Sequence, residues 1–294
     1  MDLENPRWAD RAELFAARPG GCAEARLEGL WVAGGLAGLA LRTVGVVGTR
    51  APSEAARHRA HEVGRRLARA GVCVLSGLAL GVDGAAHAGA LEGGGPTIGI
   101  LGGGHRRFFP PRNRKLAETM LARGGAVLSP YAPDEHAWPG NFLQRNGIVV
   151  ALADAVVIVE AAARSGALNT ASWAAARSIP VLVFPGDVDR PKAAGCNALI
   201  RDGATLVRDA DDILDDLGLG AGDSATVPET LATTPPRGAL EMRLLGELNG
   251  APRLLDELIE GSGGDSGAIL AALVRLEIDG VVDRRSDGTI ARVR

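Results

Sequence analysis

The chain has 294 residues, of which 46% are hydrophobic and 23% charged, as in ordinary globular proteins with room for one large and one small domain. It has no apolar run of about eighteen residues, and residues 1–13 lack the basic and apolar regions of a signal peptide, so we expect a cytoplasmic protein. The three cysteines, Cys22, Cys73 and Cys196, form no C-x-x-C pair and have no histidine at metal-ligand spacing, which predicts no disulfide framework, metal or cofactor.

The net charge of -3 conceals an uneven distribution along the chain. Residues 44–208 carry 19 basic and 12 acidic side chains, whereas residues 209–260 carry 3 and 12. Nucleic-acid affinity depends mainly on cations that neutralise phosphates. The middle of the chain, with a net charge of +7, therefore remains a candidate for nucleic-acid binding.

Short β-branched runs alternate with helical stretches through the middle of the chain, which predicts parallel β-α-β units and a doubly wound α/β domain. The predicted strands are Val44–Val47, Val72–Leu75, Thr97–Leu101, Ala126–Leu128, Ala155–Val159 and Pro180–Phe184. The predicted helices are Ser53–Ala70, Asp83–Glu92, Arg112–Arg123 and Leu168–Arg177.

The two ends of the chain differ from this pattern. Residues 1–43 form a lead-in without clear periodicity, in which Gly29–Gly34 is a candidate strand, and the core domain is expected over 44–217. Residues 218–237 have the composition of a linker. Residues 238–294 contain three helical stretches and a hairpin expected to turn at Asp287-Gly288, which predicts a winged-helix domain.

The first candidate site is Gly48-Thr49-Arg50, between a predicted strand and a predicted helix. A small residue at the strand end, free N–H groups at the helix start and a fixed cation suit a phosphate. An ordinary β-α turn with an exposed arginine is the alternative. Dinucleotide binding is disfavoured, because the G-x-G-x-x-G pattern and the later acidic residue are missing.

The second candidate is the segment 76–87, which includes Ser76, Asp83 and His87. These three residue types occur in hydrolytic triads, but no G-x-S-x-G elbow is present. We therefore expect Asp83 to be the N-cap of the next helix and His87 to pack locally.

The third candidate is the segment 102–115, in which five cations and no acids fall between Arg106 and Lys115. Phe108 and Phe109 lie among them. Clustered cations with aromatic side chains suit a groove that follows a nucleic-acid backbone, and this argument adds Arg106 and Arg107 to the candidate site. A solvated loop anchored by the two phenylalanines is the alternative.

The fourth candidate combines residues 138–146 with residues 159–170. Asn141 could cap a helix that displays Arg145 and Asn146, and Ser165-Gly166 forms a small-residue turn before another helix. All four candidates lie near predicted strand ends, where open α/β sheets bind ligands. Together they predict one crevice with several anion-binding helix starts.

Six ordered motifs resemble the DNA-processing protein A (DprA/Smf) family. They are GTR (48–50), SGLALGVDGAAH (76–87), PGNFLQRN (139–146), VEAAARSGALNTA (159–171), VFPG (183–186) and GCNALIRDGA (195–204). The resemblance covers about residues 30–216, and residues 239–294 are similar to the winged-helix tail of many members.

This resemblance implies an extended Rossmann-like fold that binds single-stranded DNA without enzymatic turnover, commonly as a homodimer. It further implies a role in natural transformation, in which incoming strands are protected and the recombinase RecA is loaded onto them. Carried over by motif, the DNA-binding residues are Gly48, Thr49, Arg50, Phe142, Arg145, Asn146, Ser165, Gly166 and Asn169, with Lys192 added from the loop after Pro185-Gly186. Phe142 is expected to stack on a base, with a purely structural core position as the alternative.

Two features depart from the family pattern. Many members begin with a SAM-like helical domain, for which residues 1–43 are too few, so we expect its role to be missing. In the expected recognition helix 266–278, Arg275 is accompanied by Glu277, and Asp279 follows, which disfavours duplex binding and suits contact with a protein at least as well.

An enzyme remains the rival hypothesis, because related Rossmann-like proteins include nucleoside monophosphate phosphoribohydrolases. Those enzymes share a P-G-G-x-G-T-x-x-E signature with a catalytic glutamate. Residues 160–170 contain neither the glycine pair nor a glutamate after the turn, which disfavours this activity.

Overall fold

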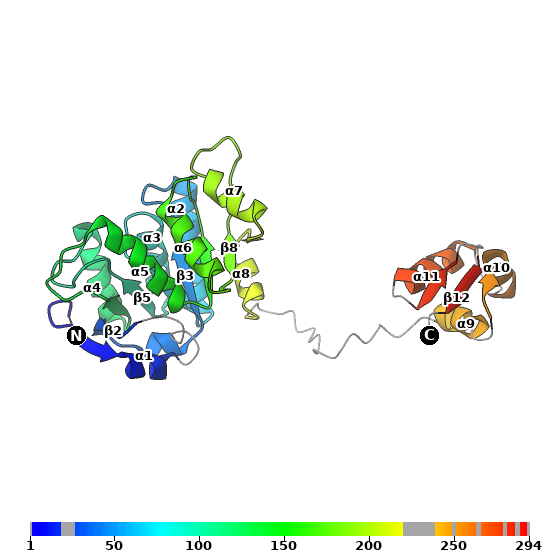
Figure 1. The fold of residues 1–294 in the computed structure, drawn as a ribbon, viewed down its shortest axis with the longest axis horizontal. Helices are drawn as coiled ribbons and strands as arrows, with labels where there is room; N and C mark the ends of the chain where they lie inside the picture. The colour runs from blue at the N-terminus through cyan, green and yellow to red at the C-terminus, as the bar shows by residue number, and fades with distance from the viewer. Residues whose placement is uncertain are drawn as a thin grey trace. The chain divides into compact units, whose positions relative to one another are not determined.

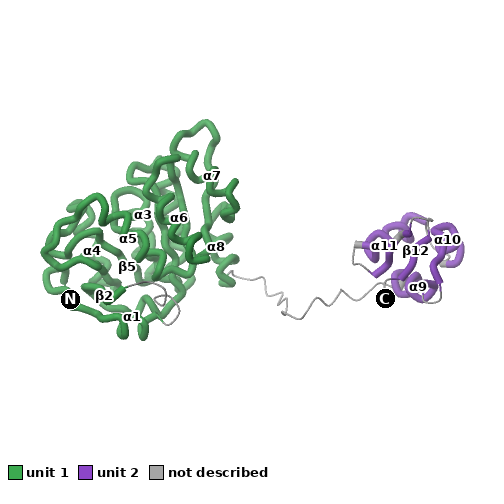
Figure 2. Tube along the Cα trace, in the orientation of Figure 1, with its two compact units in different colours: residues 1–223 green, residues 224–294 purple. Residues whose placement is uncertain are grey.

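The computed structural model describes residues 2–18, 27–219, 239–248, 251–262, 266–278, 281–285 and 289–292. The chain divides into two compact units, Met1–Asp223 and Ser224–Arg294 (Figure 2). The expected linker, 218–237, lies outside the described residues apart from its first two positions, 218 and 219.

Unit 1 is an α/β fold around a nine-stranded sheet of order β1-β2-β6-β5-β4-β3-β7-β8-β9 (Figure 1). Neighbouring strands from β6 to β9 in this order are parallel, whereas β1 and β2 are antiparallel additions at one edge. The strands are β1 (Arg7–Asp10), β2 (Gly29–Gly34), β3 (Thr43–Val47), β4 (Cys73–Ser76), β5 (Thr97–Ile100), β6 (Ala126–Ser129), β7 (Ala155–Ile158), β8 (Val181–Val183) and β9 (Thr205–Leu206). The expected doubly wound, mostly parallel sheet is thus confirmed, and residues of the lead-in 1–43 pair with it through β2 and β6.

Helices cover both faces of the sheet. One face packs against α2 (Glu54–Arg69), α3 (Val82–Gly93), α4 (Arg114–Ala122) and α8 (Ala210–Asp216). The other face packs against α1 (Arg11–Ala17), α5 (Pro139–Ala151), α6 (Gly166–Ala175) and α7 (Ala194–Arg201). Because side chains alternate along a strand, Val44 and Val46 of β3 join the first core and Val47 the second. Two short 3-10 helices, η1 (Ala37–Ala40) and η2 (Pro111–Asn113), complete the unit.

Unit 2 consists of helices packed on a small antiparallel sheet of order β10-β12-β11. Its elements are α9 (Ala239–Glu247), β10 (Arg253–Leu254), α10 (Leu255–Ser262), α11 (Ser266–Ile278), β11 (Val282–Arg284) and β12 (Thr289–Arg292). The expected hairpin is present as the β11–β12 pair, whereas its predicted turn at Asp287-Gly288 lies outside the described residues. No helix in the described part of either unit is both long and apolar enough to cross a membrane.

Candidate nucleic-acid interface

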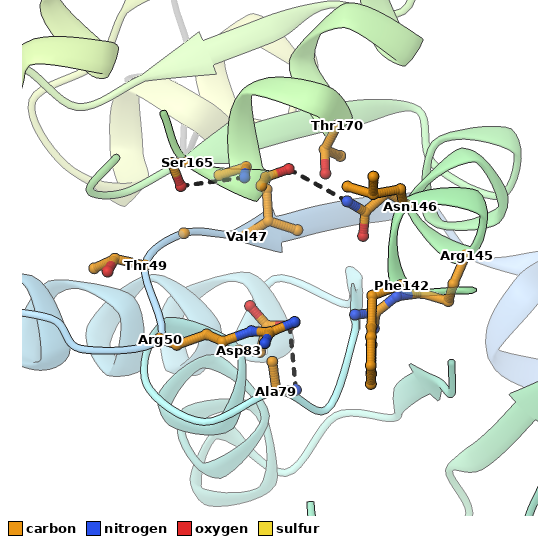
Figure 3. Close-up of a pocket in the computed structure, with 14 residues that line it drawn as sticks. Val47, Thr49, Arg50, Ala79, Asp83, Phe142, Arg145, Asn146, Ser165 and Thr170 are labelled. Atoms are coloured by element: carbon orange, nitrogen blue, oxygen red, sulfur yellow. Dashed lines mark hydrogen bonds between the residues drawn. The ribbon is translucent and has the colours of Figure 1, made fainter. Parts of the chain in front are cut away.

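A crevice of about 420 Å³ opens at the carboxyl ends of β3 and β7, on either side of the point where the strand order reverses (Figure 3). This switch point is where open α/β sheets bind ligands, because the connections from the two strands leave toward opposite faces. The residues that line the crevice are Val47, Gly48, Thr49, Arg50, Ala79, Asp83, Phe142, Leu143, Arg145, Asn146, Ser165, Gly166, Ala167 and Thr170. Three of the four sequence candidates therefore meet here.

The loop Gly48-Thr49-Arg50 forms one wall of the crevice. The Thr49 N–H donates to the carbonyl oxygen of Glu160 at 2.8 Å, which ties the loop to the end of β7. A side chain at position 48 would lie 2.7 Å from Val82, so only glycine fits this turn. Arg50 extends beyond the loop, and its Cζ lies 5.0 Å from the centre of the Phe142 ring, a cation-π contact.

The start of α2 differs from the sequence expectation of a free anion site. Ser53 is the N-cap, and its hydroxyl accepts a hydrogen bond from the Ala56 N–H at 3.2 Å. The buried carboxylate of Glu160 accepts from the Ser53 N–H and from the Ser53 hydroxyl, each at 2.9 Å. An internal anion thus already occupies this helix start, because a carboxylate there satisfies the exposed N–H groups as a phosphate would.

Phe142, in the first turns of α5, is half-buried at the mouth of the crevice. One side of its ring rests against Gly102, where an added Cβ would lie 2.7 Å from Cδ1. The Phe109 ring lies 6.0 Å away, centre to centre, and is 50% exposed. Phe109 belongs to the third sequence candidate but does not line the crevice, and its neighbour Phe108 is buried in the core.

Arg145 is buried, with 3% of its surface exposed, and is not displayed on the helix surface as the sequence suggested. Its Nη1 donates to the carbonyl oxygen of Ile100 at 2.7 Å, and the guanidinium lies against Gly77 at the end of β4. Burial lowers the pKa of Arg145, Asp83 opposes this shift, and Arg50 adds to it. The floor of the crevice therefore holds an arginine whose charge is only weakly screened by water.

Asp83 corrects a second expectation, because Gly81 and not Asp83 is the N-cap of α3. Gly81 has a φ of 87°, a backbone conformation that glycine adopts without strain. This conformation allows the helix to begin at Val82. The Asp83 Oδ2 accepts instead from the N–H groups of Gly77 and Ala79, at 3.0 and 3.3 Å, and holds the preceding loop. Burial raises the pKa of Asp83 against the opposing effects of Arg145 and these N–H groups.

Ser76 and His87 do not form a catalytic pair. The Ser76 hydroxyl donates to the Val46 carbonyl oxygen at 2.6 Å. The Thr97 hydroxyl donates to the Val74 carbonyl oxygen, so it must accept from Nδ1 of His87, which lies 2.7 Å away. Burial, and secondarily the charge of Arg145, lowers the pKa of His87 to about 3, so this imidazole is neutral.

The opposite wall is the start of α6. Ser165 is its N-cap and accepts from the Ala167 N–H at 3.2 Å, while a side chain at Gly166 would meet nothing within 4 Å. Asn146 donates to the Gly166 carbonyl oxygen at 3.3 Å and to Oδ1 of Asn169 at 3.4 Å. Asn146 is thus joined to the predicted turn of Ser165, Gly166 and Asn169, and Asn169 lies just behind the lining.

Lys192, Arg106 and Arg107 do not line the crevice. Lys192 lies close to it, since its Nζ donates to the Ala51 carbonyl oxygen at 2.6 Å. Arg106 instead pairs with Asp134 at 2.7 Å and donates to the Glu4 carbonyl oxygen at 2.9 Å, and Arg107 is exposed outside the lining. Charge density in the sequence indicated a cationic segment but not the direction of these side chains.

Two family models match this chain. DNA recombination-mediator protein A matches residues 23–218, and the DprA winged helix domain matches residues 228–288. A putative DNA processing protein DprA from Mycobacterium tuberculosis H37Rv is 38% identical over 282 residues, which cover 92% of this chain and 72% of the relative. Protein Smf from Escherichia coli K12 is 34% identical over 254 residues, covering 85% of this chain and 68% of the relative.

Solved structures agree with the sequence matches. DNA processing protein A from Streptococcus pneumoniae has a TM-score of 0.66 and 32% identity, covering 73% of this chain and 75% of that one. The protein from Helicobacter pylori, whose single-stranded DNA binding mode has been described, has a TM-score of 0.64 and 27% identity over 74% of this chain and 98% of that one. Unit 2 is accordingly a winged-helix domain. The chain belongs to the DNA-processing protein A (DprA/Smf) family.

Proposed function

We propose that this protein binds single-stranded DNA in the crevice of unit 1. The observation that carries the proposal is the Phe142 ring, which rests on Gly102 beside Arg50 at the mouth of a cationic crevice. Aromatic rings beside cations suit single strands, because every base has a face that can stack and every nucleotide has a phosphate. The related Helicobacter pylori protein, described as a binder of single-stranded DNA, supports the same function.

Phosphates would bind between Arg50 and the start of α6. The backbone at Gly166 is open to a ligand, and helix starts attract anions. The Asn146 side chain stabilises this helix start through hydrogen bonds to the Gly166 carbonyl oxygen and to Asn169. The buried charge of Arg145 adds a positive electrostatic field. The candidate DNA-binding set is therefore Gly48, Thr49, Arg50, Phe142, Arg145, Asn146, Ser165, Gly166 and Asn169, with Lys192 at its edge.

Replacement of Arg50 tests this proposal. Arg50→Ala should weaken binding of fluorescent oligo-dT and reduce the slope of log affinity against log salt by about 0.7, the value for one phosphate contact on a single strand. Arg123→Ala is the matched control, because this exposed arginine follows α4, outside the crevice lining. Unchanged affinity and slope in Arg50→Ala would refute the assignment.

Phe142 has two possible roles, which one variant separates. If the ring stacks on a base, Phe142→Ala should lower oligo-dT affinity by about 1–3 kcal/mol and leave the unfolding midpoint of unit 1 nearly unchanged. A loss of stability of about 3–5 kcal/mol would instead identify a core residue. Half-burial at the mouth of the crevice favours the first role.

We further propose that the protein acts without enzymatic turnover. Among the described residues that line the crevice, Asp83 is the one carboxylate, and it is engaged by two backbone N–H groups. Glu160 is held by Ser53 at the start of α2. Incubation with nucleoside monophosphates should release no free base; release that disappears in Asp83→Asn would revive the phosphoribohydrolase hypothesis.

The wider biological role follows as a proposal from family membership. We propose that the protein acts as a homodimer in the cytoplasm, protects incoming strands during natural transformation and helps to load RecA. Sedimentation of the purified chain tests the homodimer. Nuclease digestion of a bound strand tests protection, and the rate of strand-dependent ATP hydrolysis by RecA, with and without this protein, tests loading.

For unit 2 we propose contact with a protein in place of duplex binding. Arg275, the described arginine of α11, forms an ion pair with Glu241 of α9 at 3.1 Å, so its charge is partly neutralised within the unit. Leu270 and Val274 are exposed on the same helix. A full-length chain that prefers duplex to single-stranded DNA would contradict this assignment.

A further inference from the structure

A second groove of about 760 Å³ lies beside the crevice, on the face of unit 1 covered by α2, α3 and α4. Arg50 lines both the crevice and the groove, and the loop between β4 and α3 contributes Ala79 to the crevice and Leu80 to the groove. The two hollows are therefore neighbours that share one arginine and one loop.

The helical residues on the floor of the groove have small side chains, so the floor lies close to the helix backbone. Gly84, Ala85 and Ala88 of α3 face it. The backbones of α2 and α3 pack closely below, since a Cβ at Gly64 would lie 2.1 Å from the Ala86 carbonyl oxygen and one at Gly89 would lie 1.9 Å from that of His61. An extended chain could lie along this floor without displacing a large side chain.

The rim of the groove is cationic. It carries Arg50, Arg57 and Arg112 against a single acidic lining residue, Glu54; His58 and His61 also line the groove, and His61 lies 3.3 Å from Glu92 outside the lining. Asn113 fixes the position of η2, because its side-chain amide donates to the carbonyl oxygens of Leu78 and Ala79, each at 2.9 Å. Arg112 is therefore attached to a rigid frame next to the loop that separates the two hollows.

Two arginines of the rim lack acidic partners, as do Arg59 and Arg69 of α2 among the described residues. Within the described residues, Arg57 and Arg112 have no carboxylate within 4.0 Å. Nearby, Arg65 of α2 pairs with Glu62 and Arg66 with Asp211, and Arg114 at the start of α4 pairs with Glu4 and Glu118. Unpaired cations that converge on an open groove are available to an external polyanion.

We infer that this groove, here named the α2–α4 groove, holds the phosphate backbone of the DNA strand as it leaves the crevice past Arg50. The inference rests on the proposed function, because it extends the path of the same strand. Binding in the groove would not depend on base sequence, because the arginines neutralise phosphates and the small side chains of the floor leave room for any base. A strand long enough to reach the groove should therefore bind with a steeper salt dependence than a strand confined to the crevice.

The test compares the full chain with the double variant Arg57→Ala/Arg112→Ala, using oligo-dT of roughly 4 to 16 nucleotides, the range of common single-strand site sizes. The matched control is Arg69→Ala/Arg123→Ala. It removes the same charge from two exposed arginines at the C-terminal ends of α2 and α4, whereas Arg57 lies near the start of α2 and Arg112 lies in η2, just before α4. Circular dichroism and the unfolding midpoint check that both double variants remain folded.

For the longest strands, the groove variant should lower the salt slope by about 1.4, or about 0.7 for each lost phosphate contact. The shortest strands and the control should retain wild-type slopes. Equal losses at all lengths, equal losses in the control, or an unchanged slope with long strands would each overturn the inference. Failure of the wild-type chain to bind any strand would refute the proposed function and the groove together, whereas normal binding of short strands without a length-dependent loss refutes the groove alone.

Discussion

A methyl group at position 77 would collide with the guanidinium of Arg145. An ideal Cβ on Gly77 lies 1.6 Å from Nη1 and 2.2 Å from Cζ, so Arg145 must move in Gly77→Ala. This movement breaks the hydrogen bond that Arg145 donates to the Ile100 carbonyl oxygen. Losing a hydrogen bond from a charged group costs about 1.5–3 kcal/mol of stability, and overpacking costs about 1–3 kcal/mol more. Gly77 does not have a positive φ, so alanine itself regains about 0.4–1 kcal/mol, and we expect a net loss of about 2–5 kcal/mol.

Urea unfolding followed by tryptophan fluorescence measures this loss in unit 1, because all four tryptophans lie in it. The decisive comparison is a double-mutant cycle with Arg145→Ala. Arg145→Ala removes the three atoms nearest to the added Cβ, so Gly77→Ala should then cost less than about 1 kcal/mol. An equal loss of unfolding free energy in both backgrounds would refute the reasoning.

Three further predictions concern other contacts. Phe109→Ala should weaken oligo-dT binding by up to about 1–3 kcal/mol with little effect on folding, whereas Phe108→Ala should lower the unfolding free energy by about 3–5 kcal/mol; the opposite order would contradict the exposure of the two rings. Because the pKa of His87 falls from 6.5 to about 3 on folding, only the unfolded chain gains this proton, so the stability of unit 1 should decrease as pH falls from 6.5 toward 3. This contribution has a maximum slope of about 1.4 kcal/mol per pH unit, and His87→Asn should have a shallower profile in urea titrations; identical profiles would argue against it. Arg275→Ala should leave affinity for both duplex and single-stranded DNA unchanged in filter binding, and a selective loss with duplex would show that α11 reads DNA.

The strands and the crevice were predictable because they depend on local signals. Continuous apolar runs predicted β3 to β8, and small residues at the strand ends predicted the position of the crevice. The short edge strand β1 gave no such signal, because its Arg-Trp-Ala-Asp sequence is largely exposed and is held by pairing with β2.

The fine structure of the site depends on contacts between distant residues. Arg145 is buried because the glycine at position 77 and the carbonyl of Ile100 accommodate it, which no pattern within α5 can reveal. Likewise the carboxylate that caps α2 comes from Glu160, at a distance of 107 residues along the chain. The cluster of cations in the sequence indicated a cationic segment around Arg106. In the structure, however, Arg106 pairs with Asp134 and does not line the crevice.

The position of the crevice between β3 and β7 has a consequence for how binding free energy is used. Both strands are interior to a nine-stranded sheet, where backbone amides exchange with solvent only through large-scale opening. The walls formed by their carboxyl ends are therefore organised before a ligand arrives. In the proposed complex with single-stranded DNA, most of the ordering entropy would then be lost by the nucleic acid, so stiffening the strand in its bound shape should raise affinity more than stiffening the protein.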